Sequence, residues 1–424
     1  MSESPEPSTA ASTEHTPLVV RTTRVDDPGA LLSLLPARDD VTAWVRRGQG
    51  LVGWGVAAVC RPGGPDRFAR ARDWWAEHAA TAVVRDEVGE PGSGLVCFGS
   101  FAFADEPGDS VLVVPQVVVG RRGDTTWVTT AGAGTIAPAP DLRAGVSPDA
   151  PVGVAFADGA LSGAAWEGVV AEAVRRINDG DLEKVVLARD LVATSDVDVD
   201  VRWPLTRLAG SYPTCWTFHV DRLLGATPEM LVRRERGLVT SRVLAGTIRR
   251  TGDDARDLAL AATLARSSKD LEEHEYAVRS VAESLAPYCS SMNVPEAPFV
   301  LHLPNVMHLA TDVAGVVHEG PATSLDLAAA LHPSAAVGGT PSDVAVDVIA
   351  EIEGMDRGRY AGPVGWMDAA GDGEWGIALR SAEVDGSRVR LFAGCGIVAD
   401  SDPAAELAEA QAKFVPVRDS LGDG

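Results

Sequence analysis

From residue 17 to about residue 160 the chain consists of short apolar runs separated by glycine and proline. Apolar runs of this length, bounded by turn-forming residues, predict β-strands rather than helices. The longest of them read LVGWGVAAV, SGLVCFGSFAF and SVLVVPQVVVG, and a single helix is expected over RFARARDWWAEHAATA. We therefore expect a β-rich part over residues 17–160. Before it, the polar residues 1–16 are predicted to form a disordered tail.

Residues 161–420 combine helical and strand patterns. Apolar spacing and stop signals predict helices over 164–178, 254–288, 322–331, 341–353 and 402–419. A strand is expected over LEKVVLARDLVAT, directly after the first of these helices. The last three apolar runs, PVGWMD, EWGIALRSAEV and RVRLFAGCGIV, are joined by the turns DAAGDG and DGS. Those turns predict an antiparallel meander.

Composition and charge limit the possible partners. Of the 424 residues, 46% are hydrophobic and 23% are charged, which is typical of a globular chain with a large core. The formal net charge of −23 argues against nucleic acid or an anionic membrane as the main partner, because both attract basic surfaces. A small anionic substrate would need locally placed Lys or Arg side chains, or a divalent cation.

Cysteine usage points to a reducing compartment. The five cysteines are odd in number and widely spaced, and no CxxC pair occurs, so neither a disulfide framework nor a zinc site is indicated. No apolar run approaches the ~20 residues of a membrane span, and the N-terminus lacks the pattern of a signal peptide. We expect a cytoplasmic protein.

Two isolated residues are candidates for proton transfer. Lys184 begins the strand KVVLAR, where alternation places it on one face with Val186 and Ala188. A partly desolvated lysine can act as a general base, although a lysine at a strand edge is more often an ordinary surface residue. Glu229 lies in GATPEML, where a bend presents one carboxyl group beside an apolar run. Such a carboxyl can stay protonated and act as a general acid, whereas the alternative is a solvated turn residue.

Two acidic helices are candidates for metal binding. The segment SSKDLEEHEYAV carries Glu272, Glu273 and Glu275, and SDPAAELAEAQAKF carries Glu406 and Glu409. Acidic helical faces are usually solvated, and Glu409 could simply form an ion pair with a lysine four residues later. Alternatively, one carboxylate from each helix could bind Mg²⁺, which prefers oxygen ligands and keeps positions open for water and substrate.

A third group could bind a carboxylate. In the expected strand GEWGIALRSAEV, Arg380 shares a face with Gly376 and Ala378, and these small neighbours leave room for a ligand to reach the guanidinium. Gly394 and Gly396 of AGCGIV could bring backbone N–H groups close to the same carboxylate, or could only mark a bulge.

Taken in order, eight segments of this sequence resemble the chorismate-utilising enzymes. They are KVVLAR, GATPEML, LAGTIRR, SSKDLEEHE, LHPSAAVGGTP, RGRYAGPVGW, GEWGIALRSA and AGCGIVADSDPAAELAEAQAK. The resemblance covers about residues 165–415 and implies an α+β fold: a single domain of two large antiparallel β-sheets packed together, with helices outside. It also implies chorismate as the substrate, Mg²⁺ as the cofactor and no obligatory protein partner, with a monomer expected.

The resemblance also implies roles for matched positions. Lys184 is similar to the base that activates water for attack at C2, and Glu229 is similar to the acid that protonates the departing C4 hydroxyl. Glu273 and Glu409 resemble the magnesium ligands. The remaining matched positions resemble residues that contact the substrate. Arg380, Lys413 and the Gly394 backbone are similar to the groups that bind the enolpyruvyl carboxylate. Tyr360 and His332 resemble residues that line the site, and Ala245 and Gly246 resemble residues beside the ring.

A few positions separate the activities within this family. At the position of Ala245, aminodeoxychorismate synthases of the covalent type have a lysine nucleophile. The resemblance therefore argues against that reaction in this chain. Ala336 and Phe392 resemble isochorismate synthases, which make isochorismate from chorismate. Leu379 and Thr247 also occur in relatives that eliminate pyruvate, so a salicylate synthase is the alternative.

Two further readings have less support in the sequence. They are anthranilate synthase component I and a chorismate-binding regulator without catalysis. Menaquinone synthesis is the expected pathway, ahead of siderophore synthesis.

Overall fold

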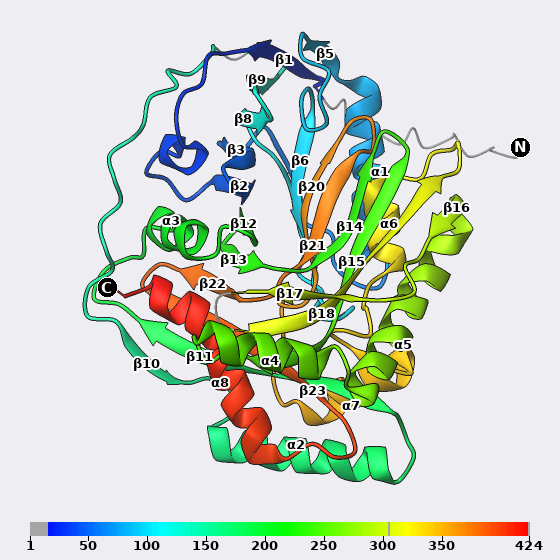
Figure 1. Ribbon diagram of the computed structural model, residues 1–424. Helices are drawn as coiled ribbons and strands as arrows, with labels where there is room; N and C mark the ends of the chain where they lie inside the picture. The colour runs from blue at the N-terminus through cyan, green and yellow to red at the C-terminus, as the bar shows by residue number, and fades with distance from the viewer. Residues whose placement is uncertain (1–15, 137, 304–305, 423–424) are drawn as a thin grey trace, which may run out of the picture.

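The computed structural model describes residues 16–136, 138–303 and 306–422, without the side chains of residues 269 and 273. The expected disordered tail, residues 1–16, lies almost wholly outside these ranges. The chain has the α+β architecture expected from the sequence: two large sheets with helices around them (Figure 1). Every ladder is antiparallel except the one between β1 (Leu18–Arg24) and β5 (Val83–Asp86).

The larger sheet, here sheet A, has 13 strands in the described part of the chain. Strands β10 and β5 lie at its two ends, and β19 adds a short pairing to β11. Beside β1 and β5, its strands are β2 (Val41–Arg46), β3 (Gln49–Trp54), β8 (Val117–Arg122), β9 (Thr125–Ala133), β10 (Ala155–Asp158), β11 (Lys184–Thr194), β12 (Trp216–Val220), β13 (Leu223–Thr227), β19 (Gly339–Thr340), β22 (Ser381–Asp385) and β23 (Arg388–Ile397).

The smaller sheet, sheet B, has 10 strands within the same ranges. The strands are β4 (Ala58–Cys60), β6 (Val96–Ser100), β7 (Val111–Val114), β14 (Met230–Glu235), β15 (Leu238–Arg249), β16 (Cys289–Asn293), β17 (Phe299–His302), β18 (Val306–Val317), β20 (Pro363–Asp368) and β21 (Gly373–Ile377). Both parts of the chain contribute to both sheets, because β2 pairs with β12 in sheet A and β6 pairs with β20 in sheet B.

Eight α-helices are described, together with the short 3-10 helices η1 (Leu31–Leu34) and η2 (Ala286–Tyr288). They are α1 (Arg67–Thr81), α2 (Gly163–Asn178), α3 (Arg202–Ser211), α4 (Asp254–Leu264), α5 (Ser268–Leu285), α6 (Ser324–Ala330), α7 (Ser342–Ile352) and α8 (Pro403–Ser420). Figure 1 shows α2 and α8 side by side below the strands of sheet A, and these two helices are in contact. No helix in the described ranges is both long enough and apolar enough to span a membrane.

The prediction of a single helix over residues 254–288 is wrong. The chain instead forms α4, breaks, and starts again as α5, which ends before η2. The break has a local cause, because the side chain of Ser267 accepts a hydrogen bond from the backbone N–H of Asp270 and so caps a new helix.

Four apolar runs change sheets partway along, which the sequence did not indicate. The chain passes between sheets at residues 55–57, 115–116, 228–229 and 378–380. The expected C-terminal meander is therefore also wrong. EWGIALRSAEV divides into β21 of sheet B and β22 of sheet A, so β20 pairs with β21 and β22 pairs with β23. Arg380 lies at that passage rather than within a strand, so it does not share a strand face with Gly376 and Ala378.

Candidate active site

A cavity lies where the chain passes between the sheets at residues 228–229 and 378–380. All of its lining residues come from the second part of the chain, beginning at Val186. The polar and charged members are Glu229, Thr247, His308, Arg357, Tyr360, Arg380 and Lys413, and the others are Val186, Pro228, Leu244, Ala336, Val337, Ala361, Leu379, Gly394 and Gly396.

Glu229 is a buried carboxyl group in the wall of this cavity, and only 6% of the residue is exposed. The hydroxyl of Thr227 accepts its backbone N–H at 3.2 Å, which fixes the bend that follows β13. Burial raises the pKa of Glu229 to about 8. The positive charges of Arg380, Lys184 and Lys413 oppose this rise without cancelling it. The carboxyl group is therefore protonated near neutral pH.

Arg380 faces the same cavity from the other passage between the sheets. Its backbone is left-handed, with φ of 50°, a conformation that non-glycine residues rarely adopt and that clusters at functional sites. The two passages are bonded together, since Ile377 donates its N–H to the carbonyl of Glu229 and Ala226 donates to the carbonyl of Arg380. Among the described side chains, no carboxylate lies within 4.0 Å of the Arg380 guanidinium. That guanidinium is therefore available to an anionic ligand.

Lys413 of α8 reaches the cavity with most of its side chain buried. Its ammonium forms an ion pair with Glu409 at 2.7 Å and donates to the carbonyl oxygen of Gly394 at 2.8 Å. An ammonium has three donors, so one N–H remains for a ligand. Burial alone would lower the pKa of Lys413, but the negative charge of Glu409 and its hydrogen bond to the ammonium raise it. The lysine therefore keeps its charge.

Tyr360 and the glycines of β23 form one wall. The ring of Tyr360 stacks on Phe392 with centroids 5.2 Å apart. A Cβ atom at Gly394 would lie 3.0 Å from the carbonyl oxygen of Leu187 and 3.1 Å from the Tyr360 hydroxyl, so this close packing favours glycine. Burial raises the pKa of Tyr360, which keeps its hydroxyl protonated.

Lys184 lies beside this cavity rather than among its lining residues. A Cβ atom at Gly396 would be 3.0 Å from Cε of Lys184, so the lysine side chain passes over that glycine. Lys184 lines a second, adjoining cavity with Glu183, Glu272 and Tyr276. Because Gly396 lines the first cavity, Lys184 lies at its edge, close enough for its charge to act on the pKa of Glu229.

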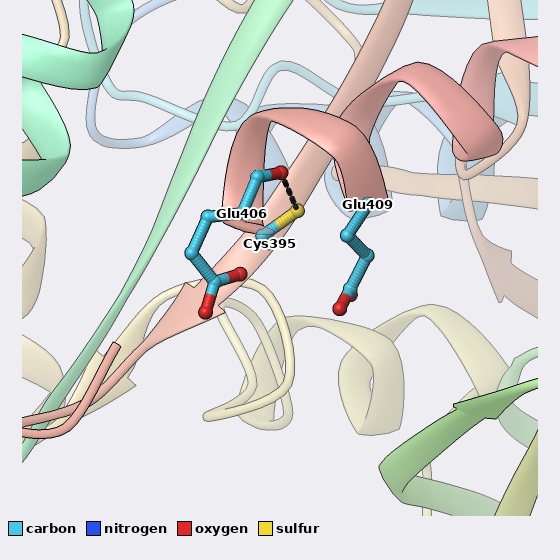
Figure 2. Close-up of side chains that lie close together, drawn as sticks. All are labelled: Cys395, Glu406 and Glu409. Carbon is cyan, nitrogen blue, oxygen red and sulfur yellow. Dashed lines mark hydrogen bonds between the residues drawn. The ribbon is translucent and has the colours of Figure 1, made fainter. Parts of the chain in front are cut away.

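Two carboxylates of α8 are candidate metal ligands (Figure 2). Oxygens of Glu406 and Glu409 and the sulfur of Cys395 all lie within 4.8 Å of one another, and Figure 2 shows both carboxylates pointing to the same side of the helix. Burial would raise the pKa of Glu409, but the charge of Lys413 and its hydrogen bond lower it, so this carboxylate is ionised. Burial raises the pKa of Cys395 to about 12, so its thiol stays neutral. The two oxygens suit a hard cation better than the sulfur does.

The second acidic helix is only partly described. Glu273, the other predicted metal ligand, lies in α5, and its side chain is outside the described residues. Asp270, one turn before it, lies against β15, because a Cβ atom at Gly246 would be 3.3 Å from its carboxylate oxygen. At Gly246 the register between β15 and β18 shifts, and φ is 72°. This bulge directs Leu244 and Thr247, rather than Ala245 and Gly246, into the cavity wall.

His332 is not among the lining residues of the cavity. Its Nε2 is bonded to the carbonyl of Phe103 at 3.0 Å, and its ring meets the Phe103 ring edge to face. Burial lowers the pKa of His332 to about 4, so it is neutral. The structure thus places the ring of His332 against Phe103 rather than on the predicted lining.

A different histidine, His308, lines the cavity, and the sequence did not single it out. It is buried within β18, opposite Thr247 of β15, whose hydroxyl lies 3.0 Å from its Nδ1. Its Nε2 is buried and has no hydrogen-bond partner among the described residues. Burial, then the charges of Arg380 and Lys413, lower the pKa of His308 to about 3. A lone histidine in an apolar strand gives no sequence signal that separates this position from a core residue.

Comparison with known proteins gives a consistent result. The family described as chorismate binding enzyme matches residues 149–422. Isochorismate synthase DhbC of Bacillus subtilis is 41% identical over 264 residues, which are 60% of this chain and 66% of that protein, just under two thirds of its length. The salicylate biosynthesis isochorismate synthase of Pseudomonas aeruginosa is 34% identical over 96% of this chain and 90% of its own. The structure of MenF, the menaquinone-specific isochorismate synthase of Escherichia coli, superposes with a TM-score of 0.78 at 26% identity, covering 96% of both chains.

Proposed function

Since the chain belongs to the family of chorismate-binding enzymes, we propose that it is an isochorismate synthase. The reaction adds water at C2 of chorismate while the C4 hydroxyl leaves. The observation that carries the proposal is the pairing of a protonated carboxyl group, Glu229, with two cationic side chains, Arg380 and Lys413, in one buried cavity.

Glu229 would act as the general acid. A departing hydroxyl needs a proton, and a carboxyl group with a pKa of about 8 still carries one at neutral pH. Its position at the bend after β13 is fixed by Thr227, so the proton is held at one place in the cavity wall.

Lys184 would act as the general base that activates water. Its side chain lies over Gly396, on the strand β23 that also forms the cavity wall. The base begins β11 and the acid lies at the bend after β13, so the two groups can approach different ring carbons. Water addition and hydroxyl departure need this separation.

Arg380 and Lys413 would hold the enolpyruvyl carboxylate. The guanidinium can form two parallel hydrogen bonds to a carboxylate, and the ammonium has one donor left beside its bonds to Glu409 and Gly394. Gly394 contributes its carbonyl to Lys413, so its backbone acts on the substrate through that lysine. These two cations allow a protein with net charge −23 to bind a dianion.

Mg²⁺ would bind between the acidic helices. Glu409 and Glu406 of α8 supply ionisable oxygens, and Glu273 of α5 is the proposed third ligand. A magnesium ion there would offset the charge of the ring carboxylate. Nε2 of neutral His308 has no partner in the described part of the chain, so it could bond an oxygen of the substrate without adding charge.

Salicylate synthase is the second candidate. Leu379 and Thr247, the two positions shared with pyruvate-eliminating relatives, both line the cavity. Ala336, the position that resembles isochorismate synthases, lines it as well. The names of the relatives favour the synthase that stops at isochorismate.

We further propose a cytoplasmic monomer that serves menaquinone synthesis. The MenF structure that superposes over almost the whole chain supports this pathway, while the Pseudomonas relative supports salicylate synthesis as the alternative. Size-exclusion chromatography with light scattering tests the oligomeric state directly.

The activity is tested by incubating the purified chain with chorismate and Mg²⁺, with and without EDTA, and separating the products by chromatography and mass spectrometry. Isochorismate that forms only with the metal is the expected result. Salicylate together with pyruvate would favour the second candidate. No product in any condition would contradict both.

A further inference from the structure

A fully buried ion pair forms part of the cavity wall. Glu353 follows α7, and Arg357 follows it by four residues, with side-chain exposures of 0% and 3%. Nε of Arg357 donates to one carboxylate oxygen of Glu353 at 2.7 Å, and Nη2 donates to the other at 2.5 Å. Arg357 itself lines the cavity.

The other bonds of this pair go to main-chain atoms of two cavity walls. Arg357 donates to the carbonyl of Val186 at 2.7 Å and to the carbonyl of Val337 at 2.8 Å. Glu353 accepts the N–H of Ala188 at 2.7 Å. Val186 and Ala188 belong to β11, whereas Val337 belongs to the loop that carries Ala336.

The pair occupies a gap in the edge of sheet A. One edge of β11 pairs with β19 only at Lys184 and Val185, and with β10 only from Leu191 onward. Between these pairings the strand would present unpaired backbone groups in the protein interior, which is costly. The Glu353–Arg357 pair bonds the carbonyl of Val186 and the N–H of Ala188 in place of a neighbouring strand.

Arg357 differs from Arg380 in what it can offer a ligand. Four of the five guanidinium donors of Arg357 are used within the protein, and Glu353 neutralises its charge. Arg380 has no such carboxylate partner among the described side chains. The bonds of Arg357 therefore suit holding backbone in place rather than binding an anion.

We propose that Glu353 and Arg357 are positioning residues, which set the distance across the cavity between the strand that begins at Lys184 and the loop that carries Ala336. The proposal rests on the proposed function, because that function makes Lys184 the base. A displacement of about 1 Å at a reacting group can lower a rate about 100-fold.

Arg357→Lys is the first test, because one ammonium keeps the charge but cannot reach Glu353 and both carbonyls together. We expect kcat to fall about 100-fold while KM for chorismate changes less than about twofold, since Arg380 and Lys413 are untouched. The matched control is Asp372→Asn, which breaks the largely buried pair between Arg234 and Asp372 away from the cavity. That control should lower the melting temperature and leave kcat unchanged.

Glu353→Gln with amide exchange gives a readout that does not depend on turnover. Glu353 uses both carboxylate oxygens as acceptors, and glutamine replaces one of them with an NH2 group that faces a donor of Arg357. The bond to the N–H of Ala188 should therefore weaken, and the exchange of this N–H should speed up at least about tenfold, whereas amides of β18 should keep their protection. This variant also serves if Arg357→Lys does not fold.

Three results would overturn the proposal: unchanged kcat in folded Arg357→Lys, a raised KM alone, or unchanged exchange at Ala188 in Glu353→Gln. A wild-type chain that makes no isochorismate would contradict the proposed function instead. The exchange result would still decide the positioning role.

Discussion

Four apolar runs cross directly from one sheet to the other, and they form two pairs that differ in their side chains. In the first part of the chain the passages are at residues 55–57 and 115–116, where Gln116 donates its N–H to the carbonyl of Gly55. In the second part they are at 228–229 and 378–380, where Glu229 and Arg380 accept backbone bonds from each other's strands. The backbone arrangement is similar in both.

The difference lies in burial and charge. Gln116 is exposed, and Gly55 has no side chain, so the first pair only turns the chain. The second pair places a buried carboxyl group and a guanidinium in one cavity. The same way of joining two sheets thus serves as scaffold at one pair and holds the proposed chemistry at the other. Substitutions at the two pairs should separate these roles.

The largest effect is expected from Glu229→Gln. The amide keeps the shape of the side chain but is far too weak an acid to transfer a proton, so kcat should fall about 100- to 10,000-fold while the fold is kept. Steady-state kinetics and circular dichroism check this together. Substantial residual turnover would remove Glu229 from the role of acid.

Arg380→Met should have the next largest effect. Losing a charged group that binds a carboxylate costs roughly 3 kcal/mol, so kcat/KM should fall about 100-fold. Gln116→Met, the same new side chain at the first pair, is the control and should leave kcat/KM unchanged. Equal effects of the two variants would mean that the passages do not differ in function.

Glu409→Gln tests whether the chemistry extends from the passages to α8. Removing one carboxylate ligand should raise the Mg²⁺ concentration for half-maximal rate about 10- to 100-fold. A magnesium titration of the rate measures this, with Glu172→Gln on the surface of α2 as control. Unchanged metal dependence would place the cation elsewhere.

The pH profile should show the titration of Glu229. Its pKa in the folded protein is about 8, so the acid form is present below that value, and kcat/KM should fall about tenfold per pH unit above it. The raised pKa also makes the stability of the fold depend on pH. The stabilisation by protonated Glu229 is fully present below the pKa of about 4.3 in the unfolded chain, and it is lost as the pH rises through about 8. A kcat/KM that stays flat to pH 9.5 would contradict the role.

The smallest effect on activity is expected from Gly55→Ala. Gly55 has φ of 72°, and an added Cβ would lie 2.6 Å from the side-chain oxygen of Gln116. The left-handed backbone costs an alanine roughly 1–2 kcal/mol, which lowers the stability measured by urea denaturation. The kcat of the folded protein should not change, and a large loss of kcat would show that the first pair is coupled to the cavity.

The sequence predicted the two-sheet α+β fold and placed Glu229 and Lys184 near one site through the ordered motifs. It could not predict the passages between sheets, because an apolar run looks the same whether it stays in one sheet or enters another. The strand face assigned to Arg380 was wrong for this reason, since alternation breaks where φ becomes positive. His332 was predicted from the motif alone; His308 lines the cavity instead, and only contacts between residues far apart in sequence show this.

The most direct test of the central claim is turnover of chorismate in ¹⁸O-labelled water, with mass spectrometry of the isochorismate formed. The mechanism assigned to Lys184 and Glu229 predicts one ¹⁸O atom, located at C2, in each product molecule, because the new hydroxyl comes from water. Isochorismate that retains only the original oxygen would mean that the hydroxyl moves within the substrate, and it would contradict the assigned base and acid.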